Sequence, residues 1–336
     1  MIKLEKNAFR SKVINCYEKY LSLSNEQKIA IGIYYKGHIY LFGNGIDSSY
    51  MYDIGSISKT VTAHLILNLI NEGKININDS IGKYLELKDG SYPTIDELLT
   101  HSAGYNHLTP IEITFFNLLC HGYSRRNLYE NIDKEDVIRC LNKRNKHKKK
   151  NKYGYSDFAY AVLALVIEKV TGNTFYEVLN DFIVEKLNLN NTSVILSENR
   201  YPLAIKNKKV FPFWKWKPNN PYLASGGITS NIQDMLKYLS LQIESKENYI
   251  KDAHIVSDYV TSNSKIRICK GWHTYVKSHQ LWHVGGVGTF RSSIIINKNS
   301  KLGVVILGNT KGVSSGNVHY LTKMIYSELK MKKIKF

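Results

Sequence analysis

Ser56 and Lys59 form an S-x-x-K pair at the start of an apolar stretch. In a helix, side chains at this spacing lie on the same face one turn apart, so the lysine ammonium can reach the serine oxygen. A serine hydroxyl becomes a nucleophile when a neighbouring group takes its proton. Ser56 follows Gly55 and opens the apolar stretch, which puts its hydroxyl at the positive end of a helix and Lys59 in a dry interior. The pair predicts a nucleophilic serine with a lysine as proton acceptor.

Taken alone, this pattern is weak evidence. It also fits an ordinary capping serine followed by a lysine whose charged end reaches water. The same spacing recurs at Ser80/Lys83, Ser262/Lys265 and Ser327/Lys330. Only Ser56 combines a preceding glycine with a thoroughly apolar helix, so Ser56 is the predicted nucleophile.

A second serine motif competes with Ser56. Gly312-Val-Ser314-Ser-Gly316 fits the G-x-S-x-G pattern of a nucleophile elbow, between an expected strand and an expected helix. That type of enzyme needs an acid and then a histidine after the serine, whereas here His319 comes before Glu328. We therefore interpret Gly312 and Gly316 as turn residues.

The elements around these motifs predict an α/β unit interrupted by a helical one. Strands are expected at 29–35, 38–42, 279–284, 289–297 and 302–308, the first two joined by a tight turn. Helices are expected at 8–23, 58–72, 94–100, 133–142, 157–171, 175–186, 231–243 and 316–330. Residues 1–74 and 231–336 are predicted to form the α/β domain and residues 75–230 a helical domain inserted in it.

Four further stretches follow Ser56 in order along the chain. They are Leu98-Leu-Thr-His-Ser-Ala-Gly104, Tyr155-Ser-Asp157, Ala224-Ser-Gly-Gly-Ile-Thr-Ser230 with Asp234-Met235, and His283-Val-Gly-Gly286. With Gly55-Ser-Ile-Ser-Lys59, they resemble the class C β-lactamase and low-molecular-weight penicillin-binding protein superfamily of serine hydrolases, over about residues 25–310. This superfamily includes DD-peptidases, D-amino-acid peptidases and esterases. The resemblance implies a β-lactamase/transpeptidase-like fold, an antiparallel sheet flanked by helices with an all-α domain, and an active site between the two domains.

The resemblance also implies a role for individual residues. Ser56 takes the role of the nucleophile that forms an acyl-enzyme, and Lys59 that of the proton acceptor or relay. Tyr155 matches the tyrosine of the Y-x-N motif, a general base when a nearby ammonium lowers its pKa. His283-Val-Gly285 matches the third motif, usually Lys-Thr-Gly, on a strand that lines the site. The oxyanion hole maps to the backbone N–H groups of Ser56 and Gly286.

Two residues depart from the family pattern. Asp157 stands where the Y-x-N motif ends in asparagine, and a carboxylate cannot donate a hydrogen bond to a substrate carbonyl. It could instead pair with Lys59 or recognise an amine on the substrate. His283 replaces a lysine, which weakens the constant positive charge that would hold the carboxylate of a β-lactam. Both departures favour an esterase, amidase or D-residue peptidase over a β-lactamase.

Composition limits the partners. The 336 residues have a globular composition, 43% hydrophobic and 22% charged, and a net charge of +18 that favours an anionic substrate. The positive residues are dispersed and no nucleic-acid-binding motif accompanies them, so nucleic acid is not the expected partner. No metal-ligand spacing or P-loop is present, so neither metal nor cofactor is expected. The chain shows no signal peptide or transmembrane stretch, which predicts a cytoplasmic location; it does not predict an oligomeric state.

Three other features near these motifs have more than one interpretation. The basic run 143–152 is a solvated loop or a basic rim that draws anionic substrates. The aromatic cluster 211–218 is a wall of the pocket or packing between domains. His101 is interpreted as structural.

The sequence therefore predicts a serine hydrolase that acts through an acyl-enzyme on an ester, an amide or a D-amino-acid-containing peptide. A β-lactamase or penicillin-binding DD-peptidase is one alternative. A catalytically silent binding or regulatory protein on the same scaffold is the other, because of Asp157.

Overall fold

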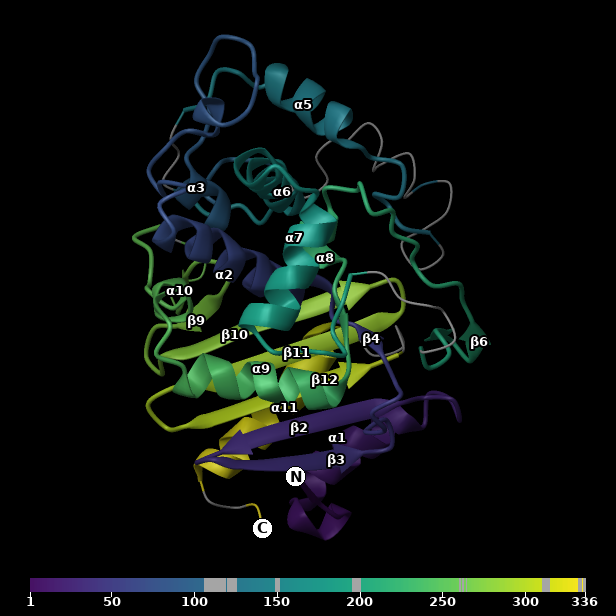
Figure 1. Cartoon of the computed structure of the whole chain (residues 1–336). Helices are drawn as coiled ribbons and strands as arrows, with labels where there is room; N and C mark the ends of the chain where they lie inside the picture. Colours follow the sequence, from purple (N-terminus) through teal and green to yellow (C-terminus); the bar gives the residue numbers. More distant parts are fainter. Residues whose placement is uncertain are drawn as a thin grey trace.

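One large sheet crosses the molecule, with helices on both of its faces and a further group of helices beyond one end (Figure 1). The computed structural model describes residues 1–105, 119, 126–148, 152–194, 201–259, 261, 263, 265–309, 315–331 and 334.

The main sheet has eight strands. In spatial order they are β1 (Ile2–Lys3), β3 (His38–Gly43), β2 (Ile29–Tyr35), β12 (Leu302–Gly308), β11 (Phe290–Asn297), β10 (Gln280–Val287), β9 (His273–Tyr275) and β8 (Ile266–Ile268). Neighbouring strands are antiparallel except β1 and β3, which run parallel. The five predicted strands and their antiparallel pairing are confirmed; the sheet as a whole is mixed because of the β1–β3 pair, and β1, β8 and β9 were not predicted.

The hairpin of β2 and β3 follows from its turn. Lys36 and Gly37 form a two-residue loop in which both φ angles are positive, +50° and +89°. Such a loop matches the right-handed twist of the flanking strands, and glycine adopts its second position without strain.

Two layers of helices enclose the sheet. They are α1 (Ser11–Leu21) and α11 (Ser315–Lys330) on one face, and α9 (Ile232–Glu244) on the other. The apolar residues of α1 and α11 form one core with the sheet. Those of α9 belong to a second core, which runs on without a break into the group of helices at the end of the sheet.

The remaining helices and short strands surround the functional residues. They are β4 (Tyr52–Asp53), η2 (Gly55–Ile57), α2 (Ser58–Asn71), η3 (Ile81–Lys83), α3 (Ile95–Leu99), α5 (Lys134–Asn142), α6 (Asp157–Thr171), α7 (Phe175–Asp181), α8 (Leu223–Gly226), β7 (Thr229–Ser230) and α10 (Asn248–Ala253). The predicted helix 175–186 is wrong in one respect, because its second half, Phe182–Lys186, is a π-helical turn. Outside these, η1 (Lys6–Ala8) precedes α1, and β5 (Ile205–Lys206) pairs with β6 (Lys209–Val210).

Helix α2 is buried all round, as its sequence predicts. All but three of its residues are buried, and they include Lys59 and His64. β4, which precedes it, pairs with β7, so the segment before Ser56 is joined to the segment that leads into α9.

Within the described residues, we find no single helix long and apolar enough to cross a bilayer. Only α6 taken together with Phe175–Lys186 meets that criterion, and the two are bent by 84°.

Candidate active site

Ser56 lies in η2, the tight turn between β4 and α2, where it is partly buried. Gly55 before it has a φ of +53°, and a Cβ there would lie 2.5 Å from the backbone nitrogen of Gly286. A Cβ on Gly285 would collide with the backbone oxygen of Ile54. Glycines at these positions therefore let the turn and β10 approach closely, which brings Ser56 next to Gly285 and Gly286.

Lys59 is completely buried and faces three oxygen atoms. Its Nζ lies 3.2 Å from Oγ of Ser56, 2.7 Å from the backbone oxygen of Ser225 and 2.5 Å from Oδ1 of Asp157. An ammonium has three N–H groups, one for each of these acceptors. Burial lowers the pKa of Lys59, and the Asp157 carboxylate acts in the opposite direction.

Asp157 is the first residue of α6 and is buried beside Lys59. Its Oδ2 accepts a hydrogen bond of 2.7 Å from the hydroxyl of Tyr129. The geometry therefore matches the first of the two roles that the sequence left open for this carboxylate, pairing with Lys59.

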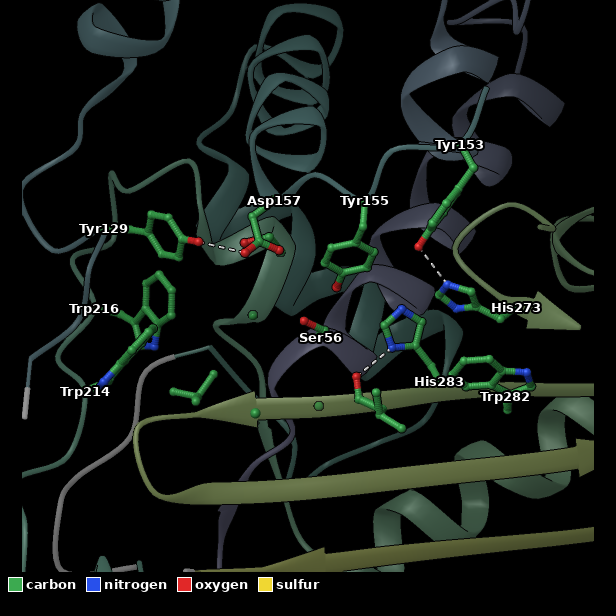
Figure 2. A pocket seen from close by; sticks show the side chains of 16 residues that line it. Ser56, Tyr129, Tyr153, Tyr155, Asp157, Trp214, Trp216, His273, Trp282 and His283 are labelled. Atoms are coloured by element: carbon green, nitrogen blue, oxygen red, sulfur yellow. Dashed lines mark hydrogen bonds between the residues drawn. The ribbon is translucent and has the colours of Figure 1, made fainter. Parts of the chain in front are cut away.

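Tyr155 stands over the serine and lysine. The Nζ of Lys59 lies 5.0 Å from the centroid of its ring, and Figure 2 shows its hydroxyl pointing toward Ser56 and His283. The nucleophile, the lysine and the tyrosine that the sequence predicts are thus brought together, although they come from different elements.

His101 holds the segment that carries Tyr155. Its backbone oxygen accepts from the N–H of Gly154 at 2.7 Å, and its Nδ1 accepts from the N–H of Ser156 at 3.2 Å. Its ring packs against that of Tyr155, with centroids 4.5 Å apart. His101 has a φ of +56°, uncommon for a residue other than glycine. From the sequence, we interpret His101 as a structural residue. In the structure it contacts the predicted catalytic tyrosine and the two residues that flank that tyrosine.

His283 lies on β10, buried, with its Nδ1 2.9 Å from the backbone oxygen of Val284. Burial holds the pKa of His283 well below its ordinary value, and His273 and Lys59 act in the same direction. On one side of β10, its pairing with β9 covers only Gln280 to Trp282. From His283 onward, β10 contacts η2.

His273 and Tyr153 also line the site, although the sequence motifs did not predict them. The Nε2 of His273 and the hydroxyl of Tyr153 are 3.0 Å apart, and the His273 ring stacks on Trp282 with centroids 4.5 Å apart. Burial lowers the pKa of His273 to about 4. No local pattern marks His273, but Tyr153 lies two residues before Tyr155 and could have been noticed from that position.

These residues surround a cavity of about 380 Å³ (Figure 2). Tyr129, Trp214 and Trp216 line it on the side of Asp157, and His273, His283 and Trp282 on the side of β10. The two tryptophans belong to the aromatic cluster 211–218, for which the sequence left open a pocket wall or packing between domains, and they line the cavity. Phe213 of that cluster instead packs against Tyr201 and Phe290.

The other candidate serines are arranged differently. Oγ of Ser80 accepts from the N–H of Gly82, and Lys83 pairs with Asp79 at 2.6 Å. Ser327 is exposed on α11. Ser262, Ser314 and residues 149–151 of the basic run lie outside the described residues.

Comparison with known proteins gives relatives over most of the chain. Protein flp of Staphylococcus aureus (strain N315) is 24% identical over 296 residues, 82% of this chain and 54% of the relative. Teichoic acid D-alanine hydrolase of the same species is 34% identical over 145 residues, 43% of this chain and 32% of the relative. The chain thus spans about half the length or less of these curated relatives.

Two solved structures share the fold. The octameric penicillin-binding protein homologue from Pyrococcus abyssi has a TM-score of 0.77 and 24% identity, covering 96% of this chain and 77% of that one. A β-lactamase/D-alanine carboxypeptidase from Yersinia pestis, complexed with citrate, has a TM-score of 0.76 and 17% identity. The match covers 97% of this chain and 100% of that one. They confirm the predicted β-lactamase/transpeptidase-like fold.

The family model named Beta-lactamase matches residues 24–322, which is most of the chain and includes every residue of the site described above. The protein therefore belongs to the Beta-lactamase family, as its motifs predicted.

Proposed function

We propose that this protein is a serine hydrolase that acts through an acyl-enzyme on an ester or amide of a D-amino acid. The observation that carries the proposal is the position of Lys59, whose Nζ lies 3.2 Å from Oγ of Ser56, and Ser56 lines the same cavity as Tyr155. A buried amine beside a serine hydroxyl is the arrangement that an activated nucleophile needs.

In the proposed reaction, Oγ of Ser56 attacks the substrate carbonyl carbon. Its proton passes to Lys59 or Tyr155 and from there to the leaving-group atom as the scissile bond breaks. The N–H groups of Ser56 and Gly286 stabilise the negative charge on the carbonyl oxygen. A water molecule then attacks the acyl-enzyme and gives its proton to the same groups, and Ser56 leaves with a proton.

The substrate class rests on three observations. One relative is named a teichoic acid D-alanine hydrolase, and the net charge of +18 suits an anionic carrier of the acyl group. The neutral His283, where the family has a lysine, supports an ester or amide over a β-lactam.

We also propose the division predicted from the sequence. Ser56, Lys59 and β10 belong to residues 1–74 and 231–336, and Tyr155, Asp157 and the aromatic wall belong to residues 75–230. The cavity then lies between the two units, as expected for an active site.

Hydrolysis of D-alanine methyl ester, D-alanine amide and a penicillin, with L-alanine methyl ester as control, tests the proposal. We expect saturable turnover of the D-ester and slower turnover of its L-enantiomer. Absence of turnover of all four would contradict it.

A second candidate is a binding protein without catalytic activity, and the Lys59–Asp157 ion pair favours it. The Asp157 carboxylate favours the protonated form of Lys59, and an ammonium cannot accept the proton of Ser56. This candidate predicts that a D-alanyl ester binds, measured by calorimetry, without release of the alcohol.

A further inference from the structure

His283 has a defined tautomer, because its Nδ1 lies 2.9 Å from the backbone oxygen of Val284. A carbonyl oxygen only accepts hydrogen bonds, so Nδ1 carries the proton. Burial and two neighbouring basic groups, His273 and Lys59, keep the ring neutral. Nε2 of His283 is therefore a lone-pair acceptor.

This acceptor nitrogen has no hydrogen-bond partner among the described residues, although it is buried. The His283 ring lines the cavity beside Tyr155 and His273 (Figure 2). A buried polar atom without a partner is costly, so the arrangement is suited to a ligand that supplies a donor.

The cavity is also poorly suited to a carboxylate. Among its described lining residues none is a lysine or an arginine. The ammonium of Lys59 behind them already faces Asp157, 2.5 Å away. A substrate carboxylate brought against Nε2 of His283 would place two acceptors together and lose its water without gaining a cation.

The position of His283 identifies the part of the substrate that it faces. On the proposed function, the group that takes the proton from Ser56 returns it to the leaving-group atom, so the leaving group lies near the Tyr155 hydroxyl. The rings of Tyr155 and His283 have centroids 6.3 Å apart. His283 therefore faces the leaving group.

We propose that the leaving group of the substrate carries a hydrogen-bond donor, a hydroxyl or an ammonium, which binds to Nε2 of His283, and that leaving groups ending in a carboxylate are disfavoured. This inference rests on the proposed function and narrows it to esters or amides of a polyol, an amino alcohol or a similar group that presents a hydroxyl or an ammonium, and no carboxylate, to His283; the carrier beyond that group can still be anionic.

The test compares two thioesters with the same N-acetyl-D-alanyl group. One has 2-mercaptoethanol as leaving group and the other has mercaptoacetate, so they differ mainly in a terminal hydroxyl against a carboxylate. Release of thiol gives kcat/KM for each. We expect the hydroxyl thioester to be preferred about tenfold or more, since a lost or mismatched buried hydrogen bond is worth at least that.

Two substitutions of His283 test the origin of the preference. His283→Lys supplies a cation, and we expect it to move the ratio toward the carboxylate thioester about tenfold or more. His283→Phe removes the acceptor without adding charge, and we expect the ratio to approach one. His38→Lys adds the same charge at an exposed residue of β3 and should leave the ratio unchanged.

The outcomes separate the two proposals. If the wild-type protein hydrolyses both thioesters equally, or prefers the carboxylate, the inference about His283 is wrong and the hydrolase remains. If neither thioester is hydrolysed and a fluorophosphonate does not label Ser56, the proposed function fails and the inference fails with it. The wild-type ratio decides the inference even if the variants do not fold.

Discussion

The ammonium nitrogen of Lys59 lies 2.5 Å from a carboxylate oxygen of Asp157, and both side chains are buried. The other carboxylate oxygen accepts from the hydroxyl of Tyr129. Each carboxylate oxygen of Asp157 thus contacts a group of the protein, and Asp157 affects the reaction through Lys59. The pairing opposes the effect of burial, which by itself lowers the pKa of Lys59.

Asp157→Asn should move the acidic limb of the pH profile of acylation to lower pH. Without the carboxylate, the pKa of Lys59 falls further below its ordinary value, so more of the lysine is a free base at a given pH. If Lys59 instead stays protonated in the variant, its charge is no longer balanced by Asp157 and stabilises the Tyr155 phenolate more strongly. The acidic limb then also moves to lower pH. The measurement is the acylation rate from pH 5 to 9 with a short-chain ester and with a penicillin.

The pH profiles of acylation by the ester and by the penicillin should shift in the same direction and by a similar amount. A gain confined to the penicillin would mean that Asp157 acts on the substrate amide, as its place in the Y-x-N motif first indicated. Tyr129→Phe, which keeps the carboxylate but removes one donor to it, should give a smaller change.

Tyr155→Phe should lower the rate of acylation about 10²–10⁴-fold, the usual contribution of a general acid or base. The matched control is Tyr153→Phe, which removes the hydroxyl two residues away that pairs with His273. We expect a much smaller loss in that variant. Near-full activity of Tyr155→Phe would show that the tyrosine is not the base.

His101→Phe should lower kcat for an ester about tenfold or more while KM changes little. Phenylalanine keeps a ring to pack against Tyr155 but loses the acceptor for the N–H of Ser156. His101→Asn should restore much of kcat, because asparagine supplies an acceptor and tolerates a positive φ. If His101→Phe unfolds more easily but keeps the wild-type kcat, the residue only stabilises the fold.

The sequence predicted the elements whose pattern is local. The apolar stretch after Ser56 was predicted as a buried helix because its apolar residues cover most of the surface of a helix. The β2–β3 hairpin was predicted from the Lys36-Gly37 turn between two strand-like stretches. The position of His273 could not be predicted, since its contact with Tyr153 joins segments far apart in the chain. For the same reason the sequence left two partners open for Asp157, and only the packing of α6 against α2 puts Lys59 beside it.

Asp53→Asn should stabilise the protein more at pH 8 than at pH 5. Asp53 is buried with the hydroxyl of Thr229 donating to it, and burial raises its pKa from 3.8 to about 7. Between these values the folded protein holds a proton that the unfolded chain has lost, so the contribution of Asp53 to stability falls as pH rises from about 4 to about 7 and is level above that. Asparagine cannot ionise and keeps an oxygen for Thr229.

Urea denaturation at the two pH values checks this prediction. We expect Asp53→Asn to raise the free energy of unfolding by roughly 1–3 kcal/mol more at pH 8 than at pH 5. Asp89→Asn, at an exposed aspartate, is the control. An equal effect of Asp53→Asn at both pH values would contradict a raised pKa.

Covalent labelling tests the identity of the nucleophile most directly. The wild-type protein, Ser56→Ala, Ser80→Ala and Ser314→Ala are treated with a fluorophosphonate, and the adduct is measured by intact mass and located by peptide mapping. We predict one adduct, on Ser56, that is absent only from Ser56→Ala, which should unfold at the wild-type temperature. An adduct that persists in Ser56→Ala, or that maps to Ser80 or Ser314, would contradict the assignment of Ser56 as the nucleophile.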